Sequence, residues 1–361
     1  APATEQTKEA YMAALFAEIG GRAKDYSDRT VTSIFIGGGT PSLLSGEQIG
    51  QLMDRIREQF AMAQDAEITM EVNPGTASAE KLRNFYTAGI NRLSIGMQSA
   101  QAEELKNLGR IHDFEGFCQV YREAVEAGFT NINVDVMSGL PGQTLASYRD
   151  TLEKVLHLEP MPQHISAYSL IVEEGTPFAA MAERGELPLP EEETERAMYE
   201  ETIEVLAQYG FRRYEISNYA RKGYECRHNV GYWIRRDYLG FGIGAASLID
   251  NVRFQNEKSL GAYLAHPLES REEEQTLTVQ DRMEETMFLG LRLTRGVSCV
   301  DFAEQYGRTV EEVYGEVIAR NVADGLLTVT ERKENQKKDR FLALTKRGLD
   351  LSNYVMAQFL F

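Results

Sequence analysis

The chain has 361 residues, a formal net charge of −17 and a hydrophobic content of 43%. Its length suits one large domain plus a smaller one. The acidic balance argues against nucleic acid as a main partner, because phosphate binding relies on an excess of Lys and Arg. No apolar run approaches the roughly 18 residues of a membrane span, and the first residues lack a signal-peptide pattern. We therefore expect a cytoplasmic protein.

Hydrophobic periodicity predicts a helix around residues 12–19 that ends at Gly20-Gly21, and then an alternation of strands and helices. The expected strands lie at residues 31–36, 68–72, 92–95, 132–136, 165–170 and 213–216. The expected helices between them lie at residues 47–59, 79–88, 114–127, 145–156 and 191–208. Strands that alternate with helices imply right-handed βαβ units and a parallel sheet, hence an α/β barrel or a doubly wound fold.

After about residue 250 this alternation stops. The expected elements there are helices at 282–293, 301–306 and 310–321, a hairpin of 325–330 with 341–344 across a charged loop at 331–339, and a last helix at 350–358. Two helices followed by a hairpin are typical of a winged helix. Acids and bases nearly balance in this region, which favours a packing or lid domain over a DNA reader. We predict one domain at 1–250 and a second at 251–361.

A glycine-rich turn, Gly37-Gly38-Gly39-Thr40-Pro41-Ser42, follows the first expected strand. Glycines let the backbone come close to a ligand, and ligands of α/β folds sit at the carboxyl ends of strands. The turn is not a phosphate-binding loop, because no Lys follows the glycines. It is not a GxGxxG motif either, because Pro41 and Ser42 break the spacing. A glycine-rich turn alone is more often only a tight turn, so the rest of the chain has to decide.

Polar groups also follow the later strands. They are Glu71-Val72-Asn73-Pro74-Gly75, Gly96-Met97-Gln98-Ser99, the stretch from Asp135 to Gly142, and Tyr168-Ser169. Any single one of them is explained by a helix cap or a turn. Polar groups at the same end of successive strands, however, are typical of a barrel active site.

The three cysteines, Cys118, Cys226 and Cys299, lie far apart in the sequence. No pair has the spacing of metal ligands, and the pattern does not resemble a disulfide framework. We expect each to be a small buried or half-buried thiol. The residues of this chain therefore predict no cluster site and no zinc site.

Taken in order, the turn at Gly37, Glu71-Val72-Asn73-Pro74, Ser94 to Ser99, Leu108-Gly109-Arg110-Ile111-His112 and Asp135 to Thr144 resemble the oxygen-independent coproporphyrinogen III oxidase-like branch of the radical SAM superfamily. The resemblance implies a partial (β/α)6 barrel, with its first strand missing from this chain, and a small α+β winged-helix-like C-terminal domain. It also implies a site for S-adenosylmethionine. The residues carried over to that site are Gly38, Gly39, Thr40, Glu71, Gln98, Arg110, Asp135 and Ser169.

The chemistry of these residues suits a zwitterionic cofactor with a ribose. Free backbone N–H groups and Arg110 suit its carboxylate, whereas Glu71 and Asp135 suit the ammonium, the sulfonium or the hydroxyls. Two structural alternatives stay open: Glu71 caps a following helix, and Arg110 sits in a surface ion pair.

The same resemblance implies a [4Fe–4S] cluster, bound by a Cys-x-x-x-Cys-x-x-Cys loop after the first barrel strand. This chain begins with Ala1 at about the point where that loop has ended, and it has none of the three ligands. Either an N-terminal segment with these cysteines precedes Ala1, or the cluster has been lost. We favour the missing segment, because residues 31–36 would otherwise form a bare edge of a hydrophobic sheet. The 361 residues alone are not expected to cleave S-adenosylmethionine.

Two later stretches, Tyr214 to Ala220 and His228-Asn229-Val230-Gly231-Tyr232-Trp233, are similar to the haem-chaperone members of this family. This resemblance implies a haem site at His228, Tyr232 and Trp233. An imidazole is a good axial ligand for haem iron, the aromatic rings stack on a porphyrin, and Arg235 and Arg236 suit its propionates. The alternatives are a core histidine with a packing tryptophan, and Cys226 as a thiolate ligand.

The resemblance therefore implies a chaperone that binds haem and delivers it to haem proteins. Its expected partners are haem or porphyrin, a haem-accepting protein and an electron donor, with peripheral membrane association through the acceptor. A second reading is the oxidase itself, which decarboxylates coproporphyrinogen III with a 5′-deoxyadenosyl radical. A third keeps the barrel with another ligand and no radical chemistry, and only the missing cysteines support it.

Overall fold

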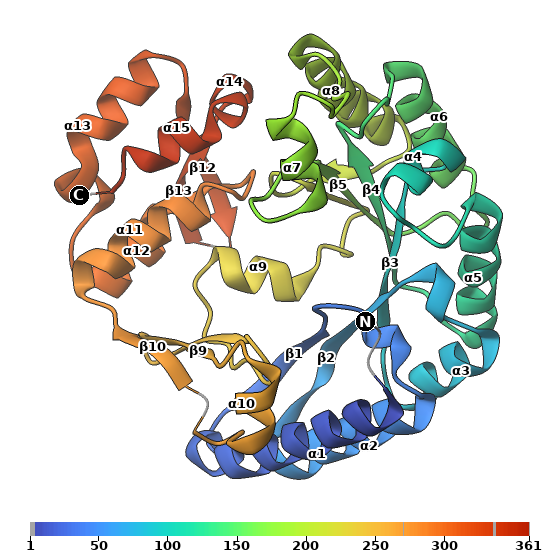
Figure 1. Ribbon diagram of the computed structural model, residues 1–361. Helices are drawn as coiled ribbons and strands as arrows, with labels where there is room; N and C mark the ends of the chain where they lie inside the picture. The colour runs from blue at the N-terminus through green and yellow to red at the C-terminus, as the bar shows by residue number, and fades with distance from the viewer. Residues whose placement is uncertain (1–3, 270, 335–336, 361) are drawn as a thin grey trace. The chain divides into compact units, whose positions relative to one another are not determined.

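The structure is a computed structural model and describes residues 4–269, 271–334 and 337–360. The chain divides into two compact units (Figure 1). The barrel unit comprises residues 30–213 and 217–225, and the terminal unit comprises Ala1–Arg29, Tyr214–Ile216 and Cys226–Phe361. Residues 226–250 thus group with the C-terminal part of the chain, and a domain boundary at residue 250 stays a prediction.

The barrel unit is built on a sheet that has seven strands in the described part of the chain, in the order β1-β2-β3-β4-β5-β7-β6. The strands are β1 Thr30–Ile36, β2 Ala61–Val72, β3 Arg92–Gln98, β4 Ile132–Ser138, β5 His164–Ser169, β6 Arg212–Arg213 and β7 Asn218–Ala220. Strands β1 to β5 are parallel, β7 is antiparallel to β5, and β6 is antiparallel to β7. This sheet confirms the predicted partial barrel.

Helices cover the outer face of this sheet (Figure 1). They are α2 Gly46–Gln59, α3 Ala79–Thr87, α5 Phe114–Ala127, α6 Leu145–Leu156 and α8 Glu192–Gln208, with the short α4 Ala102–Asn107 and α7 Pro177–Glu183 in the connections. Their starts follow from local chemistry, because Ser45 and Thr144 form capping boxes and Asp113 caps α5. The five helices predicted between the strands are confirmed to within one residue at their ends.

Several predicted element ends are wrong: the strand expected at 68–72 begins at Ala61, the helix expected at 282–293 spans Val279–Gly290, and the last helix, expected at 350–358, spans Ser352–Ala357. Two further differences have a visible cause. Helix α1 (Glu5–Arg22) does not stop at Gly20-Gly21 but runs through both glycines. The side chain of Leu268 occupies the space where a Cβ of Gly21 would lie. Gly21 is therefore needed for packing and not as a helix end. The strand expected at 213–216 stops at Arg213, because the Tyr214 carbonyl turns away to accept a hydrogen bond from the Thr294 amide (3.0 Å).

The terminal unit has two small antiparallel sheets in its described residues, β10-β9-β8 and β11-β13-β12. The strands are β8 Ala246–Ile249, β9 Val252–Asn256, β10 Arg271–Thr276, β11 Val297–Ser298, β12 Leu327–Glu334 and β13 Lys337–Leu344. Its helices after α1 and the 3-10 turn at Ala23–Tyr26 are α9 Arg227–Trp233, α10 Leu260–Ala265, α11 Val279–Gly290, α12 Cys299–Tyr306, α13 Val310–Ala323, α14 Lys346–Asp350 and α15 Ser352–Ala357.

An apolar core holds the winged-helix-like part together. Met287, Leu291, Phe302, Val355 and Phe359 are among its fully buried side chains. The charged loop predicted at 331–339 is mostly strand, since pairing of β12 with β13 continues out to Glu334 opposite Lys337. Residues 335–336 of that prediction lie outside the described residues.

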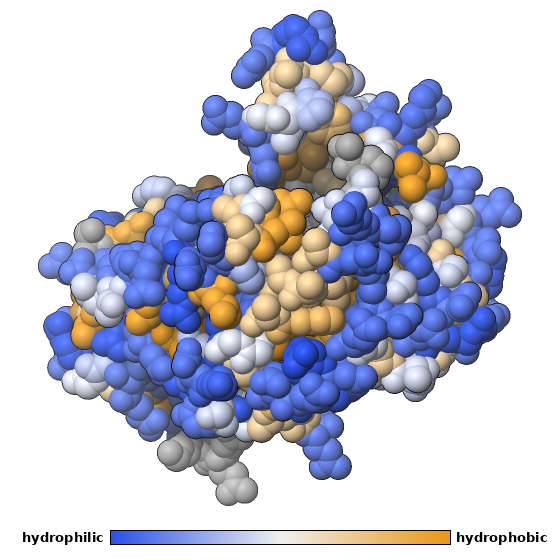
Figure 2. Space-filling model, turned by 60° about the horizontal axis from the view of Figure 1, so that its bottom comes forward, coloured by the Kyte–Doolittle hydropathy of each residue, from blue (hydrophilic) through white to orange (hydrophobic). Residues whose placement is uncertain are grey.

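No helix in the described ranges has the length and apolar character needed to cross a membrane. The face drawn in Figure 2 is mainly hydrophilic, in keeping with the net charge of −17.

Candidate functional site

Strand register brings the residues predicted from β2 to β5 to the carboxyl edge of the barrel sheet. Glu71 lies opposite Ser94, Gly96 opposite Asp135, and Ser138 opposite Ser169. Neighbouring strands are about 4.8 Å apart, so side chains in register on the same face are neighbours. We call Gly38, Gly39, Thr40, Glu71, Gln98, Asp135 and Ser169 the strand-end cluster.

The glycine turn after β1 faces open space on one side and is held by hydrogen bonds on the other. Gly38 and Gly39 have φ angles of +79° and +64°, and a Cβ on either would meet no atom within 4 Å. Behind the turn, the fully buried Ser42 hydroxyl accepts a hydrogen bond from the Asn73 amide (3.0 Å) and lies 2.6 Å from Thr76 Oγ1. The Cα side of this turn is therefore open to a ligand, and its backbone is held in a fixed geometry.

Glu71 is directed at this turn. Its Oε2 accepts a hydrogen bond from the Gly38 amide at 3.1 Å. The following 3-10 helix, Pro74–Thr76, is capped instead by Asn73, whose side chain accepts from the Gly75 amide. Glu71 is thus not a helix cap, and one of the two structural alternatives is wrong.

Gln98 holds a strained conformation at the end of β3. It is a non-glycine residue with a φ of 69° and is only 8% exposed. Such a conformation costs about 1–3 kcal/mol and persists where the surroundings impose it, often at functional sites. A Cβ on Gly96 would lie 2.8 Å from Gln98 Nε2, so the glycine makes room for this amide.

Two carboxylates with perturbed protonation lie in the strand-end cluster. Burial raises the pKa of Asp135, and hydrogen bonds from Asn133, Ser166 and Ser94 oppose that rise. Burial also raises the pKa of Glu71, against the hydrogen bond from Gly38, and the nearby charge of Asp135 raises it further. A cationic group bound between them would relieve their repulsion. The cluster therefore fits a ligand that presents an ammonium or sulfonium beside a carboxylate.

Arg110 and Ser169 have no described contact with the two carboxylates of this arrangement. The Arg110 guanidinium makes no hydrogen bond or ion pair within the described chain, so the surface ion pair proposed as an alternative is not seen. Ser169 is exposed, with its hydroxyl 3.2 Å from Ser138 Oγ. Neither residue hydrogen-bonds to Glu71 or Asp135 in the part of the chain that the structure describes.

Sequence reasoning missed the residues that support Asp135. Asn133 Nδ2 donates to Asp135 Oδ1 (2.7 Å), and Ser94 Oγ donates to Asp135 Oδ2 (3.2 Å). His164 and Ser166, on β5, both contact Asn133 Oδ1. The signal was a polar residue at every second position of the buried strands, as in Asn133-Val134-Asp135 and His164-Ile165-Ser166.

The predicted haem residues lie on the seven-residue helix α9 in the terminal unit. His228 Nε2 is 3.0 Å from Tyr232 Oη, and the two rings meet edge to face with centroids 4.9 Å apart. Tyr232 packs in the same way on Tyr238 (4.7 Å). Burial raises the pKa of Tyr232 to about 12, so its hydroxyl stays protonated at neutral pH. The Arg292 guanidinium lies 4.3 Å from the Trp233 ring centre, and the buried indole N–H has no hydrogen-bond partner in the described residues.

The structure places the neighbours of α9 differently from the sequence prediction. Arg235 Nε donates to Glu285 Oε2 (2.8 Å), and both side chains are buried; Arg253 pairs with the other oxygen of Glu285 (2.7 Å). Arg235 is therefore occupied within the protein and is not available to a propionate. Arg236 is exposed and stays a candidate. Cys226 is fully buried, which disfavours it as a ligand for an incoming haem.

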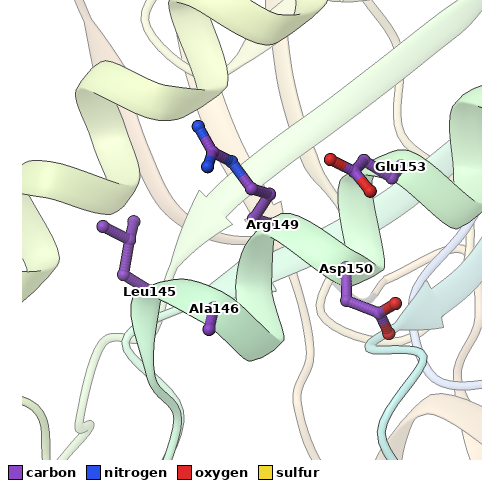
Figure 3. Close-up of a pocket in the computed structure, with 5 residues that line it drawn as sticks. All are labelled: Leu145, Ala146, Arg149, Asp150 and Glu153. Carbon is purple, nitrogen blue, oxygen red and sulfur yellow. The ribbon is translucent and has the colours of Figure 1, made fainter.

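The residues of this chain fit S-adenosylmethionine but not an iron–sulfur cluster. Within the described ranges, no three His, Cys, Asp or Glu side chains lie together as metal ligands. Cys118, Cys226 and Cys299 are separate free thiols. A shallow depression on α6, lined by Leu145, Ala146, Arg149, Asp150 and Glu153, contains none of the predicted site residues (Figure 3).

Comparison with known proteins matches the two parts of the chain to two sequence families. The Radical SAM superfamily matches residues 5–155, and the HemN C-terminal domain matches residues 277–351. The protein named heme chaperone HemW from Bacillus subtilis is 37% identical over 362 residues, which cover 98% of this chain and 92% of the relative. The chain belongs to the HemW family of radical SAM proteins.

Other relatives agree with this membership. A heme chaperone HemW from Lactococcus lactis is 35% identical and is matched over 99% of this chain and 91% of its own length. Among solved structures, coproporphyrinogen III oxidase (HemN) from Escherichia coli superimposes with a TM-score of 0.82 at 27% identity, over 99% of this chain and 84% of that one. Both the resemblance read from the motifs and the predicted fold are confirmed.

Membership of this family implies S-adenosylmethionine and a [4Fe–4S] cluster as cofactors. The strand-end cluster fits the first of them, on the open glycine turn and the two carboxylates. In radical SAM chemistry the [4Fe–4S] cluster supplies an electron to S-adenosylmethionine. Its thiolate ligands are not among the residues of this chain.

Proposed function

We propose that this protein is a haem chaperone, which binds haem and delivers it to haem proteins. The observation that carries this proposal is the 37% identity to a protein named heme chaperone HemW across 98% of the chain. The same name recurs among the other relatives at similar identity. The hydrogen-bonded His228–Tyr232 pair on α9 supports it, since it places an imidazole beside aromatic rings.

In this proposal His228 is the axial ligand of the haem iron. Its Nε2 is paired with the Tyr232 hydroxyl in the free protein, so coordination through Nε2 requires that this hydrogen bond opens. Tyr232 and Trp233 then pack on the porphyrin, although Arg292 already lies against the Trp233 ring. The exposed Arg236 binds a propionate.

We also propose that the strand-end cluster binds S-adenosylmethionine. Backbone N–H groups of Gly39 and Thr40, together with Arg110, hold the carboxylate, and the Gly38 N–H joins them when its hydrogen bond to Glu71 opens. Glu71 and Asp135 accept hydrogen bonds from the ammonium or the ribose hydroxyls, and binding of the cation favours the ionised form of both. Gln98 and Ser169 complete the polar lining of the site.

A haem-accepting protein and an electron donor are the partners that this function requires. We propose that the protein works in the cytoplasm and reaches a membrane only through its acceptor. The absence of a helix able to span a membrane, within the described residues, is compatible with this arrangement.

One observation favours a second function. The match to coproporphyrinogen III oxidase from Escherichia coli covers 99% of this chain with a TM-score of 0.82. Its sequence identity of 27% is lower than the 37% shared with the Bacillus subtilis chaperone. We therefore rank oxidative decarboxylation of coproporphyrinogen III second.

Haem transfer separates the two functions. The protein is loaded with one equivalent of haem, freed of excess haem and mixed with an apo-haem protein of higher affinity, while the absorbance of the acceptor's haem is followed. We expect the acceptor to fill. In a second assay, coproporphyrinogen III is incubated with the protein expressed from its full coding sequence and loaded with its cluster. Decarboxylation in this assay, without haem transfer in the first, would reverse the ranking.

A further inference from the structure

The carboxylate of Asp135 belongs to a hydrogen-bonded network inside the barrel unit. The roles proposed above do not account for the other members of this network. The network reaches from β3 across β4 to β5, on the face of the sheet that carries Glu71 and Asp135. Its members besides Asp135 are Ser94, Asn133, His164 and Ser166, and all four are at most 7% exposed. Buried polar networks in which every member has a partner fix one arrangement of their groups.

Asn133 is the centre of this network. Its Nδ2 donates to Asp135 Oδ1 and to Ser94 Oγ, both at 2.7 Å. Its Oδ1 contacts His164 Nδ1 at 2.6 Å and accepts from Ser166 Oγ at 3.1 Å. A carboxylate is an acceptor only, so the amide nitrogen must face Asp135 and the amide oxygen must face β5. The orientation of the amide is thus set from both sides.

His164 supports that orientation from the side of β5. Because Asn133 presents an oxygen, the proton of the imidazole must lie on Nδ1. The ring is fully buried, and burial together with the charge of Arg92 holds the pKa of His164 well below its usual value. His164 is therefore a neutral donor at physiological pH and does not neutralise Asp135.

The charged and titratable groups that face Asp135 come from three neighbouring strands. Glu71 on β2 is a second carboxylate, whose pKa the charge of Asp135 raises. Arg92 on β3 is fully buried, donates a long hydrogen bond to Thr69 Oγ1 (3.5 Å) and favours the ionised form of Asp135. His164 on β5 is neutral. Hydrogen bonds from neutral donors are thus a main support of the negative charge on Asp135.

We propose that Asn133 and His164 are positioning residues that hold Asp135 as an oriented carboxylate for S-adenosylmethionine. Asn133 donates to Oδ1 and Ser94 donates to Oδ2, which leaves the remaining lone pairs of the carboxylate for the ligand. His164 and Ser166 hold the Asn133 amide oxygen from β5. The proposal rests on the S-adenosylmethionine site proposed above and adds to it the residues that determine the pH range over which that site binds.

The test is the affinity for S-adenosylmethionine, measured by calorimetry between about pH 5 and pH 8, where carboxylates with raised pKa values titrate. Removal of the Asn133 donor raises the pKa of Asp135. In Asn133→Ala we therefore expect the loss of affinity on acidification to begin about one pH unit higher than in the wild type. Ser94→Ala, which removes the longer hydrogen bond, is expected to shift the profile the same way by less. It serves as the second variant if Asn133→Ala does not fold.

His164 is tested by a pair of substitutions. His164→Leu removes one of the two contacts on the Asn133 amide oxygen, and we expect it to shift the pH profile in the same direction as Asn133→Ala does, by a smaller amount. His164→Gln retains an N–H donor, and we expect it to restore the wild-type profile. Tyr148→Phe is the matched control, because it removes a buried hydrogen bond to Thr202 (2.7 Å) between α6 and α8 without touching Asp135. It should leave the profile unchanged.

A pH profile in folded Asn133→Ala that coincides with that of the wild type would overturn the positioning role while the S-adenosylmethionine site stands. An equal loss of affinity at every pH would overturn it too, since that result indicates only a distorted site. Absence of S-adenosylmethionine binding by the wild type at every pH would remove the proposed site and this inference with it. Haem transfer, measured separately, shows whether the chaperone function survives.

Discussion

The two candidate ligand sites of this protein are assembled in opposite ways. The strand-end cluster draws its side chains from five strands that span residues 30 to 169, and strand register sets their positions. The candidate haem residues lie within the seven residues of α9, where His228 and Tyr232 are neighbours at i and i+4. The first site exists only when the whole sheet has formed, whereas the second needs one short helix held in place.

The contacts that hold the two sites in place also differ. Neutral donors on β4 itself and on the adjacent strands surround Asp135, and no cation lies within ion-pair distance of it in the described chain. Arg235 lies two residues after the end of α9 and is paired with the buried Glu285 on α11. The barrel site therefore keeps two carboxylates without an ion-paired cation, whereas α9 is held by the buried Arg235–Glu285 pair and by the ring contacts of Tyr232 and Trp233. Four substitutions sharpen this comparison.

The largest effect is expected for Glu285→Ala. It leaves Arg235 buried without its partner and also removes the partner of Arg253. Breaking a buried ion pair on one side costs about 3–5 kcal/mol. Denaturant unfolding measures the loss, and Glu285→Gln, which keeps two hydrogen-bond groups, should lose less. If the free energy of unfolding of Glu285→Ala equals that of the wild type within error, the Arg235–Glu285 pair does not hold α9 in place.

Gly38→Val is expected to reduce the affinity for S-adenosylmethionine by at least about tenfold, or 1.4 kcal/mol. A Val side chain would enter the open space in front of the turn, and its φ of +79° is strained for a β-branched residue. Gly185→Val is the matched control, because Gly185 has a φ of +67° and open space but lies after α7. Equal losses of affinity in the two variants would mean that strain alone is responsible. Haem binding should be unchanged in both.

Asp135→Asn should abolish most S-adenosylmethionine binding without lowering stability at neutral pH. The pKa of Asp135 is raised in the folded state, so the folded form binds the proton more tightly than the unfolded form. Its contribution to stability is full below the unfolded pKa of about 3.9 and is lost as the pH rises through the folded pKa. The variant should therefore lose less stability than the wild type between acid and neutral pH. A neutral-pH stability well below that of the wild type would contradict this account of the carboxylate.

Tyr148→Phe should have the smallest effect. It removes the hydrogen bond between Tyr148 and Thr202 while Thr202 still donates to the Met198 carbonyl (2.8 Å). We expect a loss of about 1 kcal/mol in the free energy of unfolding. Calorimetry and haem titration should show wild-type affinities for both ligands, because helix α6 carries none of the site residues.

The barrel could be predicted from the sequence because its helices and strands alternate with clear periodicity and end in caps and glycines. The sheet β10-β9-β8 could not. Strand β10, Arg271–Thr276, is exposed throughout and has no hydrophobic alternation. One signal was overlooked: Asp250 and Asn251 form a two-residue hairpin turn with positive φ angles of 51° and 64° between Ile249 and Val252.

Some residues of the candidate sites could also be predicted from the sequence, and others could not. Residues at strand ends could be predicted from position alone, and Glu71 and Asp135 do lie on one edge of the sheet. Asn133 and His164 carried only the weak signal of alternating polar residues in a buried strand, and their role can be assigned only once their register neighbours are known. Arg235 was assigned to a ligand because its partner Glu285 lies fifty residues away in the sequence.

The haem affinity of the wild type and of His228→Ala, measured by absorbance titration of both proteins side by side, tests the central claim most directly. His228 lies on the part-buried face of α9, and its loss removes the proposed iron ligand without disturbing the Arg235–Glu285 pair. We predict that the wild type binds one haem and that His228→Ala binds it at least about tenfold more weakly, with an altered Soret band. Equal affinity and identical spectra in the two proteins would contradict the assignment of the haem site to α9.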